Sequence, residues 1–167
     1  MVTISTSISA VKSAKIRRLS DYWNGLRGDR PAPRRDEIDP SEIGSLLPYI
    51  MITQLERDPF RVRFRLVGTK VVEITGFEFT GRYLDQIALP EDEGEFEACY
   101  RMAAEKRAPV FSRPVWHVDQ WTALSYDFAV FPLSDDGATI DKALSIECYD
   151  EVERHPSVLR KLQGPSR

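Results

Sequence analysis

The clearest hydrophobic pattern in the chain spans residues 60–67, which read FRVRFRLV. Apolar side chains take every second position and arginines take the positions between them. A pleated strand would therefore bury one face and leave the guanidinium groups on the other. This arrangement is typical of an antiparallel strand with one buried face. Residues 49–56 predict a preceding strand, and the turn formers at 57–59 join the two strands into a hairpin.

The alternation stops at Gly68, where helical spacing replaces it. Thr69 is placed to cap a short helix over residues 70–75, and Gly76 suits the left-handed residue that ends such a helix. A second helical segment is predicted around residues 83–87. This change of period predicts short helices packed on one face of the sheet.

A longer amphipathic helix is predicted over residues 90–107, with Phe96, Tyr100 and Ala103 as its inward stripe. Acidic residues cluster at its start, where the helix macrodipole favours them, and no His or Cys joins them, so we predict no metal site. Three further strands are predicted at 110–118, 121–133 and 139–149. Two strands, a helical crossover and three strands predict an α+β fold with a five-stranded antiparallel sheet and helices on one face.

The two ends of the chain flank this plan. Residues 1–6 form a polar tail that we expect to be disordered. A helix follows, from Ser7 or Ser9 as its cap to about Gly28. The predicted organisation is a tail and helix over 1–28, a core domain over 29–150 and a C-terminal tail or short helix over 151–167.

One face of the N-terminal helix carries large apolar side chains: Leu19, Tyr22, Trp23 and Leu26. One interpretation packs them on the outside of the chain's own sheet. The other is a subunit contact, since large aromatic residues are enriched at interfaces. Both can hold in a dimer, and we expect a homodimer whose contact includes these four residues.

Composition narrows the classes of function. At 167 residues the chain fits one domain with a core of its own. Its formal net charge of -3 provides no overall field toward nucleic acid or anionic lipid, so we expect no nucleic-acid binding. No apolar run approaches the ~20 residues of a membrane span, and no signal-peptide core is evident, which favours the cytoplasm and argues against membrane insertion. Cys99 and Cys148 are expected to be reduced core thiols.

No arrangement of residues in the sequence predicts catalysis. A nucleophile with its base, a metal cluster and a phosphate-binding loop each need a recognisable spacing, and none is found. His117 lies in a predicted strand and His155 in the C-terminal segment, so the two imidazoles do not suggest one site. A solitary strand histidine is typically structural, which argues against haem or metal ligation by His117. We expect a protein that is not an enzyme.

Four short motifs follow one another along the chain. They read YWNGLRG at 22–28, PRRDEIDP at 33–40, LP at 47–48 and RLVGT at 65–69. In this order they resemble a PAS domain, and more narrowly a bacterial single-domain PAS-like family found mainly in alphaproteobacteria, although the second motif is one residue longer than the family pattern. The resemblance runs from about Leu19 to Tyr149. It implies a sensing or interaction domain.

The resemblance also implies a cavity between the sheet and its helices. Aromatic residues would line it or simply pack in the core. Aromatic residues with polar groups are the candidate ligand-binding residues: Tyr83, Tyr100, Trp116 and Tyr126. Residues 81–84 resemble the place where flavin-binding photosensory PAS domains hold a cysteine, and this chain has none there. We therefore predict no flavin-thiol photocycle and no cofactor, neither haem nor flavin.

Two functions stay open at this point. One is a sensor that responds to a small-molecule ligand. The other is a ligand-free adaptor or dimerisation module that regulates a signalling protein, such as a histidine kinase or a diguanylate-type enzyme. Because the sequence shows no output domain, we expect a protein partner under either reading.

Overall fold

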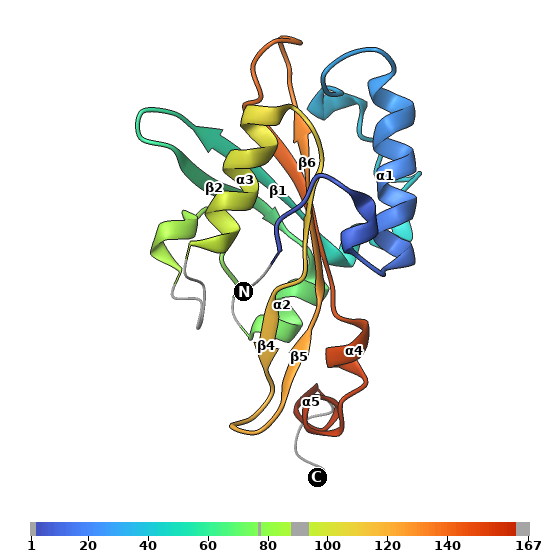
Figure 1. Cartoon of the computed structure of the whole chain (residues 1–167), viewed down its shortest axis with the longest axis vertical. Helices are drawn as coiled ribbons and strands as arrows, with labels where there is room; N and C mark the ends of the chain where they lie inside the picture. Colours follow the sequence, from blue (N-terminus) through green and yellow to red (C-terminus); the bar gives the residue numbers. More distant parts are fainter. Residues whose placement is uncertain (1–2, 77, 88–93, 163–167) are drawn as a thin grey trace.

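The fold is seen in a computed structural model of the chain, which describes residues 3–76, 78–87 and 94–162. Its centre is a five-stranded antiparallel sheet with the strand order β2-β1-β7-β6-β3 (Figure 1). The strands of the sheet are β1 (Ile50–Glu56), β2 (Arg61–Val67), β3 (Val110–Ser112), β6 (Asp127–Leu133) and β7 (Lys142–Cys148). A two-stranded ribbon pairs β4 (Val115–His117) with β5 (Ala123–Ser125). The predicted α+β class and five-stranded antiparallel sheet are confirmed.

Helices cover both faces of the sheet. The two longer ones are α1 (Ala14–Arg27) and α3 (Glu95–Lys106), which lie on opposite sides of the sheet in Figure 1. The shorter ones are η1 (Ile8–Ala10), η2 (Arg35–Glu37), η3 (Gly44–Tyr49), α2 (Thr69–Thr75), η4 (Leu84–Gln86), α4 (Asp150–Glu153) and α5 (Pro156–Leu162).

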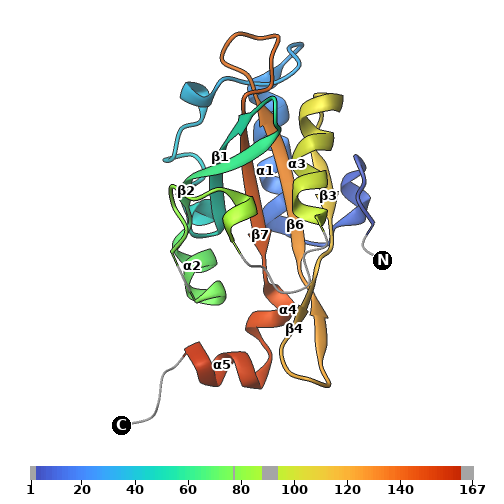
Figure 2. The same cartoon turned by 90° about the vertical axis from the view of Figure 1, so that its left-hand side faces the viewer.

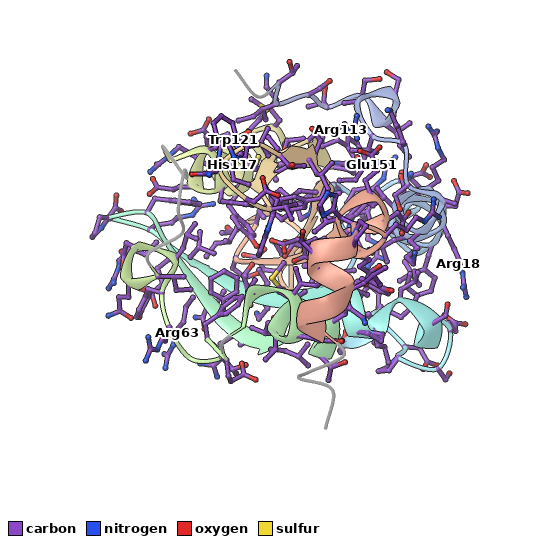
Figure 3. All side chains as sticks on the ribbon, turned by 90° about the horizontal axis from the view of Figure 1, so that it is seen from below. Arg18, Arg63, Arg113, His117, Trp121 and Glu151 are labelled. Atoms are coloured by element: carbon purple, nitrogen blue, oxygen red, sulfur yellow. The ribbon has the colours of Figure 1, made fainter. Side chains whose placement is uncertain are left out.

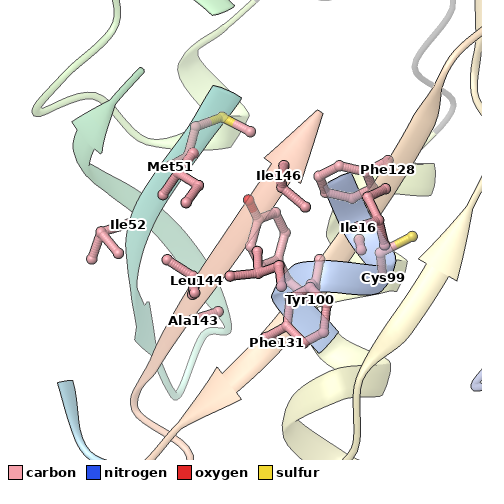
Figure 4. Close-up of a cluster of buried hydrophobic side chains, with 14 of the residues drawn as sticks. Ile16, Met51, Ile52, Cys99, Tyr100, Phe128, Phe131, Ala143, Leu144 and Ile146 are labelled. Atoms are coloured by element: carbon pink, nitrogen blue, oxygen red, sulfur yellow. The ribbon is translucent and has the colours of Figure 1, made fainter. Parts of the chain in front are cut away.

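Aromatic contacts along β6 show how the two long helices divide the core. Phe131 meets Trp23 of α1, with ring centroids 6.2 Å apart. Phe128, three residues earlier, meets Tyr100 of α3 at 6.0 Å (Figure 4). Because neighbouring side chains of a strand point to opposite faces, α1 and α3 pack on opposite faces of the sheet. The Trp23 indole also donates a hydrogen bond of 2.8 Å to the Pro132 carbonyl oxygen.

The apolar stripe of α1 lies largely inside the chain. Leu19 and Trp23 are buried against the sheet, so packing within the chain accounts for both. Tyr22 and Leu26 are only partly buried, and the Tyr22 hydroxyl accepts a hydrogen bond of 2.9 Å from the Asp39 amide. A subunit contact through Tyr22 and Leu26 stays a prediction.

The N-terminal segment differs from the expected disordered tail. Ser5 pairs with Phe111 at the outer edge of β3, through amide-to-carbonyl hydrogen bonds of 2.9 and 2.7 Å in the two directions. The polar composition hid this pairing, because a single strand-like residue leaves no hydrophobic period. Residues 1–2 of the predicted tail lie outside the described residues.

The start of the first helix also differs from the prediction. The helical turn η1 ends at Ala10, and the chain is extended at Val11 and Ser13 before α1 begins. Asp127 explains the interruption, since its Oδ2 accepts hydrogen bonds from the amides of Lys12 at 2.7 Å and Ser13 at 2.6 Å. A contact more than a hundred residues away in sequence thus decides where the helix starts.

The short helix predicted after the alternating strand is present as α2. Gly76 ends it with φ +85°, in the left-handed region, as predicted. Its cap residue is Gly68 rather than Thr69. A Cβ atom on Gly68 would lie 2.3 Å from the Pro48 carbonyl oxygen, so only glycine permits this close approach of two backbone segments.

Two predicted strands are interrupted at the same level of the sheet. The stretch 110–118 divides into β3 and β4, and 121–133 divides into β5 and β6. Pro114 lies at the break and has no N–H to donate to the ladder, although its carbonyl accepts a hydrogen bond of 3.1 Å from the Tyr126 amide. The outer halves form the β4-β5 ribbon, which extends toward the same end of the molecule as α4 and α5 (Figures 1 and 2).

Three further helix boundaries were predicted differently. Pro48 lies inside η3 instead of ending the helical turn before it. The C-terminal helix is divided, because Pro156 opens α5 as a new helix, a position where its missing N–H carries no penalty. The long helix begins at Glu95, and the start predicted over 90–93 lies outside the described residues.

Candidate functional site

A cavity of about 230 Å³ lies on the α3 face of the sheet. The sheet supplies its floor through Met51, Phe64, Phe128 and Glu147. The alternation that predicted the β2 strand explains the placement of Phe64, whose ring stands edge-on to that of Phe79 with centroids 4.8 Å apart. Three of these four floor residues are apolar, so the floor is hydrophobic apart from one carboxyl group.

Helix α3 forms one wall with Phe96 and Tyr100, and Glu95 lies at its start. The Phe96 and Phe128 rings are in edge contact at 5.0 Å. The Tyr100 hydroxyl is hydrogen-bonded to Ser145 Oγ at 2.8 Å. Burial raises the pKa of Tyr100 far above its usual value, so this residue stays a neutral hydroxyl.

The ribbon forms the opposite wall. Trp116 and His117 belong to β4, and Tyr126 lies between β5 and β6. The Trp116 and Tyr126 rings are 6.5 Å apart in an edge-on arrangement. The Tyr126 ring packs in turn against that of Tyr149, at the end of β7, at 5.1 Å. This wall therefore joins the ribbon to the central strand of the sheet.

Glu147 is the carboxyl group in the floor of the cavity. It is only 9% exposed, and the Tyr149 hydroxyl donates a hydrogen bond to its Oε2. Burial raises the pKa of the Glu147 carboxyl to about 8, because desolvation disfavours the charged form. A buried acid that borders a cavity is a recognised indicator of a functional site.

Three of the four predicted ligand-binding residues meet at this cavity, namely Tyr100, Trp116 and Tyr126. Tyr83 does not line it. The Tyr83 hydroxyl donates to Glu56 at 2.8 Å, and the Arg61 guanidinium lies 3.6 Å from the centre of its ring. The chain turns back after residues 80–81 and pairs Tyr83 with Arg63, which places the ring on the arginine face of β2.

Sequence reasoning missed Glu147. The signal was present in the strand ALSIEC at 143–148, where the apolar Leu144 and Ile146 alternate with the small or polar Ala143, Ser145 and Glu147. In the structure both sets are buried. An acidic residue in a strand whose two faces are both covered is costly to bury, and this is what marks it as a site residue.

Two further observations on the described residues concern metal binding and membrane crossing. No group of three or more His, Cys, Asp or Glu side chains in these ranges is placed to hold a metal ion. None of the helices there combines the length and the apolar character that a bilayer crossing requires. Cys99 and Cys148 are buried free thiols, as predicted, and neither is among the described residues that line the cavity.

The sheet order and the cavity between sheet and helices agree with a family assignment. The sequence model of the family described as "PAS domain" matches residues 11–146. The chain belongs to the PAS domain family. Among curated proteins, none matches this PAS domain significantly.

Solved structures similar to this PAS domain include light-oxygen-voltage proteins. One, titled "Flavin Analogue Sheds Light on Light-Oxygen-Voltage Domain Mechanism", is 12% identical, covers 65% of this chain and 81% of that chain, and has a TM-score of 0.48. The light-state dimer of the fungal blue-light photoreceptor Vivid is 13% identical, covers 85% of this chain and 99% of that chain, and has a TM-score of 0.47. The light-state structure of the Aureochrome1 LOV domain is 17% identical, covers 64% of this chain and 84% of that chain, and has a TM-score of 0.44. At these identities the likeness concerns the fold.

The prediction that this PAS domain binds no flavin is contradicted by these light-oxygen-voltage neighbours, one of which is described with a flavin analogue. The physical weakness of the prediction was its reliance on the missing cysteine at 81–84. A thiol is needed for a covalent adduct, but a flavin ring can also be held without a covalent bond by stacking and hydrogen bonding. The missing thiol therefore bears on the photocycle and not on binding.

Proposed function

We propose that this PAS domain is a sensory module that binds a small molecule in its cavity and passes its state to a partner protein by surface contact. The observation that carries the proposal is the cavity of about 230 Å³, with mostly aromatic walls and one buried carboxyl in its floor. Ligand sites are typically apolar concavities with a few polar groups that orient the ligand. Tyr100, Trp116, Tyr126 and Glu147 are the residues we assign to ligand contact.

The β4-β5 ribbon is the element we expect to carry the signal. Its Trp116 lines the cavity, whereas Trp121 at its tip is 87% exposed. At its root, Arg113 pairs with Asp127 at 2.8 Å and with Glu151 of α4 at 3.5 Å (Figure 3). A ligand that displaces Trp116 would therefore shift the ribbon against α4 and change the surface that a partner meets.

The ligand-free adaptor is a second candidate function, and the exposed Trp121 favours it. Tryptophan is enriched at protein interfaces, where its large ring anchors the contact. In this function the ribbon tip would bind a signalling protein whatever the cavity holds. The two candidate functions differ in whether a ligand in the cavity changes the position of the β4-β5 ribbon.

The narrower expectations from the sequence remain part of the proposal. The four motifs support a bacterial PAS-like protein, and the absence of a recognisable catalytic spacing supports a protein that is not an enzyme. The partly buried Tyr22 and Leu26 support a homodimer contact beside α1. The sequence composition supports a cytoplasmic location without nucleic-acid binding.

Tryptophan fluorescence tests ligand sensing directly. Small aromatic compounds are titrated into the wild type, into Trp116→Phe and into the matched control Trp121→Phe. A cavity ligand should change the emission of the wild type and of Trp121→Phe, and the change should be lost in Trp116→Phe. Native mass spectrometry and an absorption spectrum of the purified protein identify a retained molecule, flavin included. If no molecule is retained and no compound alters Trp116 emission, the sensor function is wrong and the adaptor is favoured.

A further inference from the structure

We propose that the cavity selects a small organic cation, with an ammonium or amidinium group attached to an aromatic or aliphatic body. The inference rests on the proposed sensory function, and it names the ligand class of the same cavity. Its basis is a juxtaposition of two kinds of group, carboxyl groups and aromatic faces, around one apolar space.

The described lining of the cavity holds more acidic side chains than basic ones, with His117 as its imidazole. Among the described residues that line it, two are glutamates, Glu95 and Glu147, and none is a lysine or an arginine. An anionic ligand would therefore be brought next to two carboxyl groups, which disfavours it in a low-dielectric site. A cation is attracted to the same groups. The sign of the charge thus separates ligand classes that an apolar cavity alone would not separate.

The aromatic walls favour the same class. Phe96 and Phe128 meet on one side of the cavity, and Trp116 and Tyr126 meet on the other. The faces of such rings carry negative electrostatic potential and attract organic cations, most strongly where water is excluded. Carboxyl groups combined with aromatic faces form the chemical environment that recognises ammonium groups.

Tyr149 joins these two kinds of group at one place. Its hydroxyl donates to Glu147, and its ring packs against that of Tyr126 at 5.1 Å. The buried acid therefore adjoins the aromatic wall rather than a separate polar pocket. Desolvation raises the pKa of Glu147 to about 8, and a cationic ligand would offset that desolvation by pairing with the carboxylate.

The volume limits the body of the ligand. An apolar cavity of about 150 Å³ holds benzene. The cavity here measures about 230 Å³, so it has room for a phenyl ring with a short side chain. 2-Phenylethylamine is therefore a suitable cationic probe. 2-Phenylethanol and phenylacetate have nearly the same shape and are the neutral and anionic probes.

Isothermal titration of the wild type with the three probes tests the proposal without any variant. We expect the amine to bind at least roughly tenfold more tightly than the alcohol, a difference of about 1.4 kcal/mol, and the carboxylate to bind most weakly. Equal affinity for amine and alcohol, preference for the carboxylate, or binding of none of the three would each overturn the inference. Alcohol binding without amine preference would overturn it while leaving the proposed sensory function intact.

The variant Glu147→Gln keeps the shape of the side chain and removes its ability to ionise. It should weaken the amine at least roughly tenfold and leave the alcohol within about threefold. The matched control is Glu105→Gln, because Glu105 is an exposed glutamate on α3 outside the cavity lining, and it should change neither affinity. Loss of amine and alcohol affinity to the same degree in Glu147→Gln would contradict the assigned role of the carboxylate.

The pH dependence gives a second readout. From about pH 6 to about pH 8 the ionised fraction of Glu147 rises to about half, so the affinity of the wild type for the amine should rise. The other titratable groups around it are Glu95, His117, Tyr100, Tyr126 and Tyr149. Glu147→Gln is measured over the same range, as the control for these other groups. A rise of equal size in Glu147→Gln would overturn the inference.

Discussion

The two faces of the central sheet differ in how their residues are used. On the α1 face the sheet presents large apolar side chains, Leu144 and Ile146 from β7 and Phe131 from β6. Helix α1 covers this face and buries Leu19 and Trp23 there. On the α3 face β7 presents the smaller or polar Ala143, Ser145 and Glu147, and Glu147 borders the cavity together with Phe128 of β6. One sheet thus combines a close-packed apolar layer with a layer that holds polar groups around a cavity.

This difference shows where stability and function are separated in the fold. Close packing of apolar side chains stabilises the native state, and each buried methylene contributes about 0.8 kcal/mol. Polar groups such as Ser145 and Glu147 contribute less to stability, and the acid opposes folding when it is charged. Substitutions on the α1 face should therefore act on folding, whereas substitutions on the α3 face should act on binding and on pH dependence.

The largest effect is expected on the α1 face from Trp23→Ala. The change removes a fully buried indole and its hydrogen bond to Pro132, so the free energy of unfolding should fall by about 3 to 5 kcal/mol. Chemical denaturation measures the loss, and Trp121→Ala is the control, because Trp121 is exposed and should change stability by about 0.5 kcal/mol or less. Sedimentation equilibrium should show the same mass for both variants. If Trp23→Ala shifts the protein from dimer to monomer without changing its stability, Trp23 belongs to a subunit interface and not to the core of its own chain.

The next effect is expected on the cavity face from Phe64→Ala. Phe64 is buried against Phe79 but borders the cavity, so the loss should lie at the lower end for a core phenylalanine, at about 3 kcal/mol. Arg63→Ala on the other face of the same strand should cost less than about 1 kcal/mol. Equal losses for the two variants in denaturant titrations would show that the face assignment of β2 is wrong.

A smaller effect that depends on pH is expected for Glu147. Because its folded pKa of about 8 lies above the usual value of 4.5, folding takes up a proton between these values. The stability of the wild type should therefore fall, relative to Glu147→Gln, as pH rises through this window. The difference should reach about 2 kcal/mol near pH 6 and vanish near pH 4, as measured by urea denaturation in matched buffers. A difference that does not vary with pH would mean that the buried carboxyl does not titrate as described.

The smallest effect is expected for Ser145→Ala, which removes the hydroxyl bonded to Tyr100 at 2.8 Å. The loss should be about 1 kcal/mol, the usual contribution of a buried neutral hydrogen bond. Tyr100→Phe and the double variant complete a thermodynamic cycle that isolates this interaction. A coupling energy of zero would mean that the two hydroxyls stabilise the fold independently.

The fold could be predicted from local patterns because its main elements have local causes. The alternation in FRVRFRLV predicted β2 and its buried face, and Gly76 predicted the end of α2. Gly68 was located correctly as the end of the alternation, but its tight approach to the Pro48 carbonyl is a contact between segments that no local pattern records. The start of α1 was missed for the same kind of reason, because Asp127 fixes it from a distant strand.

The candidate site was only partly predictable, since a cavity is formed by segments that are far apart in sequence. Aromatic residues with polar groups indicated Tyr100, Trp116 and Tyr126, whose side chains lie on its walls. Tyr83 has the same chemistry but lies on the arginine face, because strand pairing with Arg63 orients it there. Glu147 was missed because a polar residue in a strand is ordinarily assigned to the side that faces solvent. Only the helices on both faces of the sheet show that β7 has no side that faces solvent.

The pairing of Ser5 with Phe111 has a consequence for aggregation. An uncovered strand edge is a template on which another chain can add a strand, and native proteins block such edges. Ser5 occupies hydrogen-bonding groups of β3 at one end of the sheet, and at the other end Phe64 of β2 bonds to the backbone of Gly81 and Arg82. Growth of the sheet into a continuous intermolecular ladder would first have to displace these segments. Copies of this domain should therefore associate through helices or side-chain surfaces, and deletion of residues 1–6 should make the protein more prone to form β-rich aggregates.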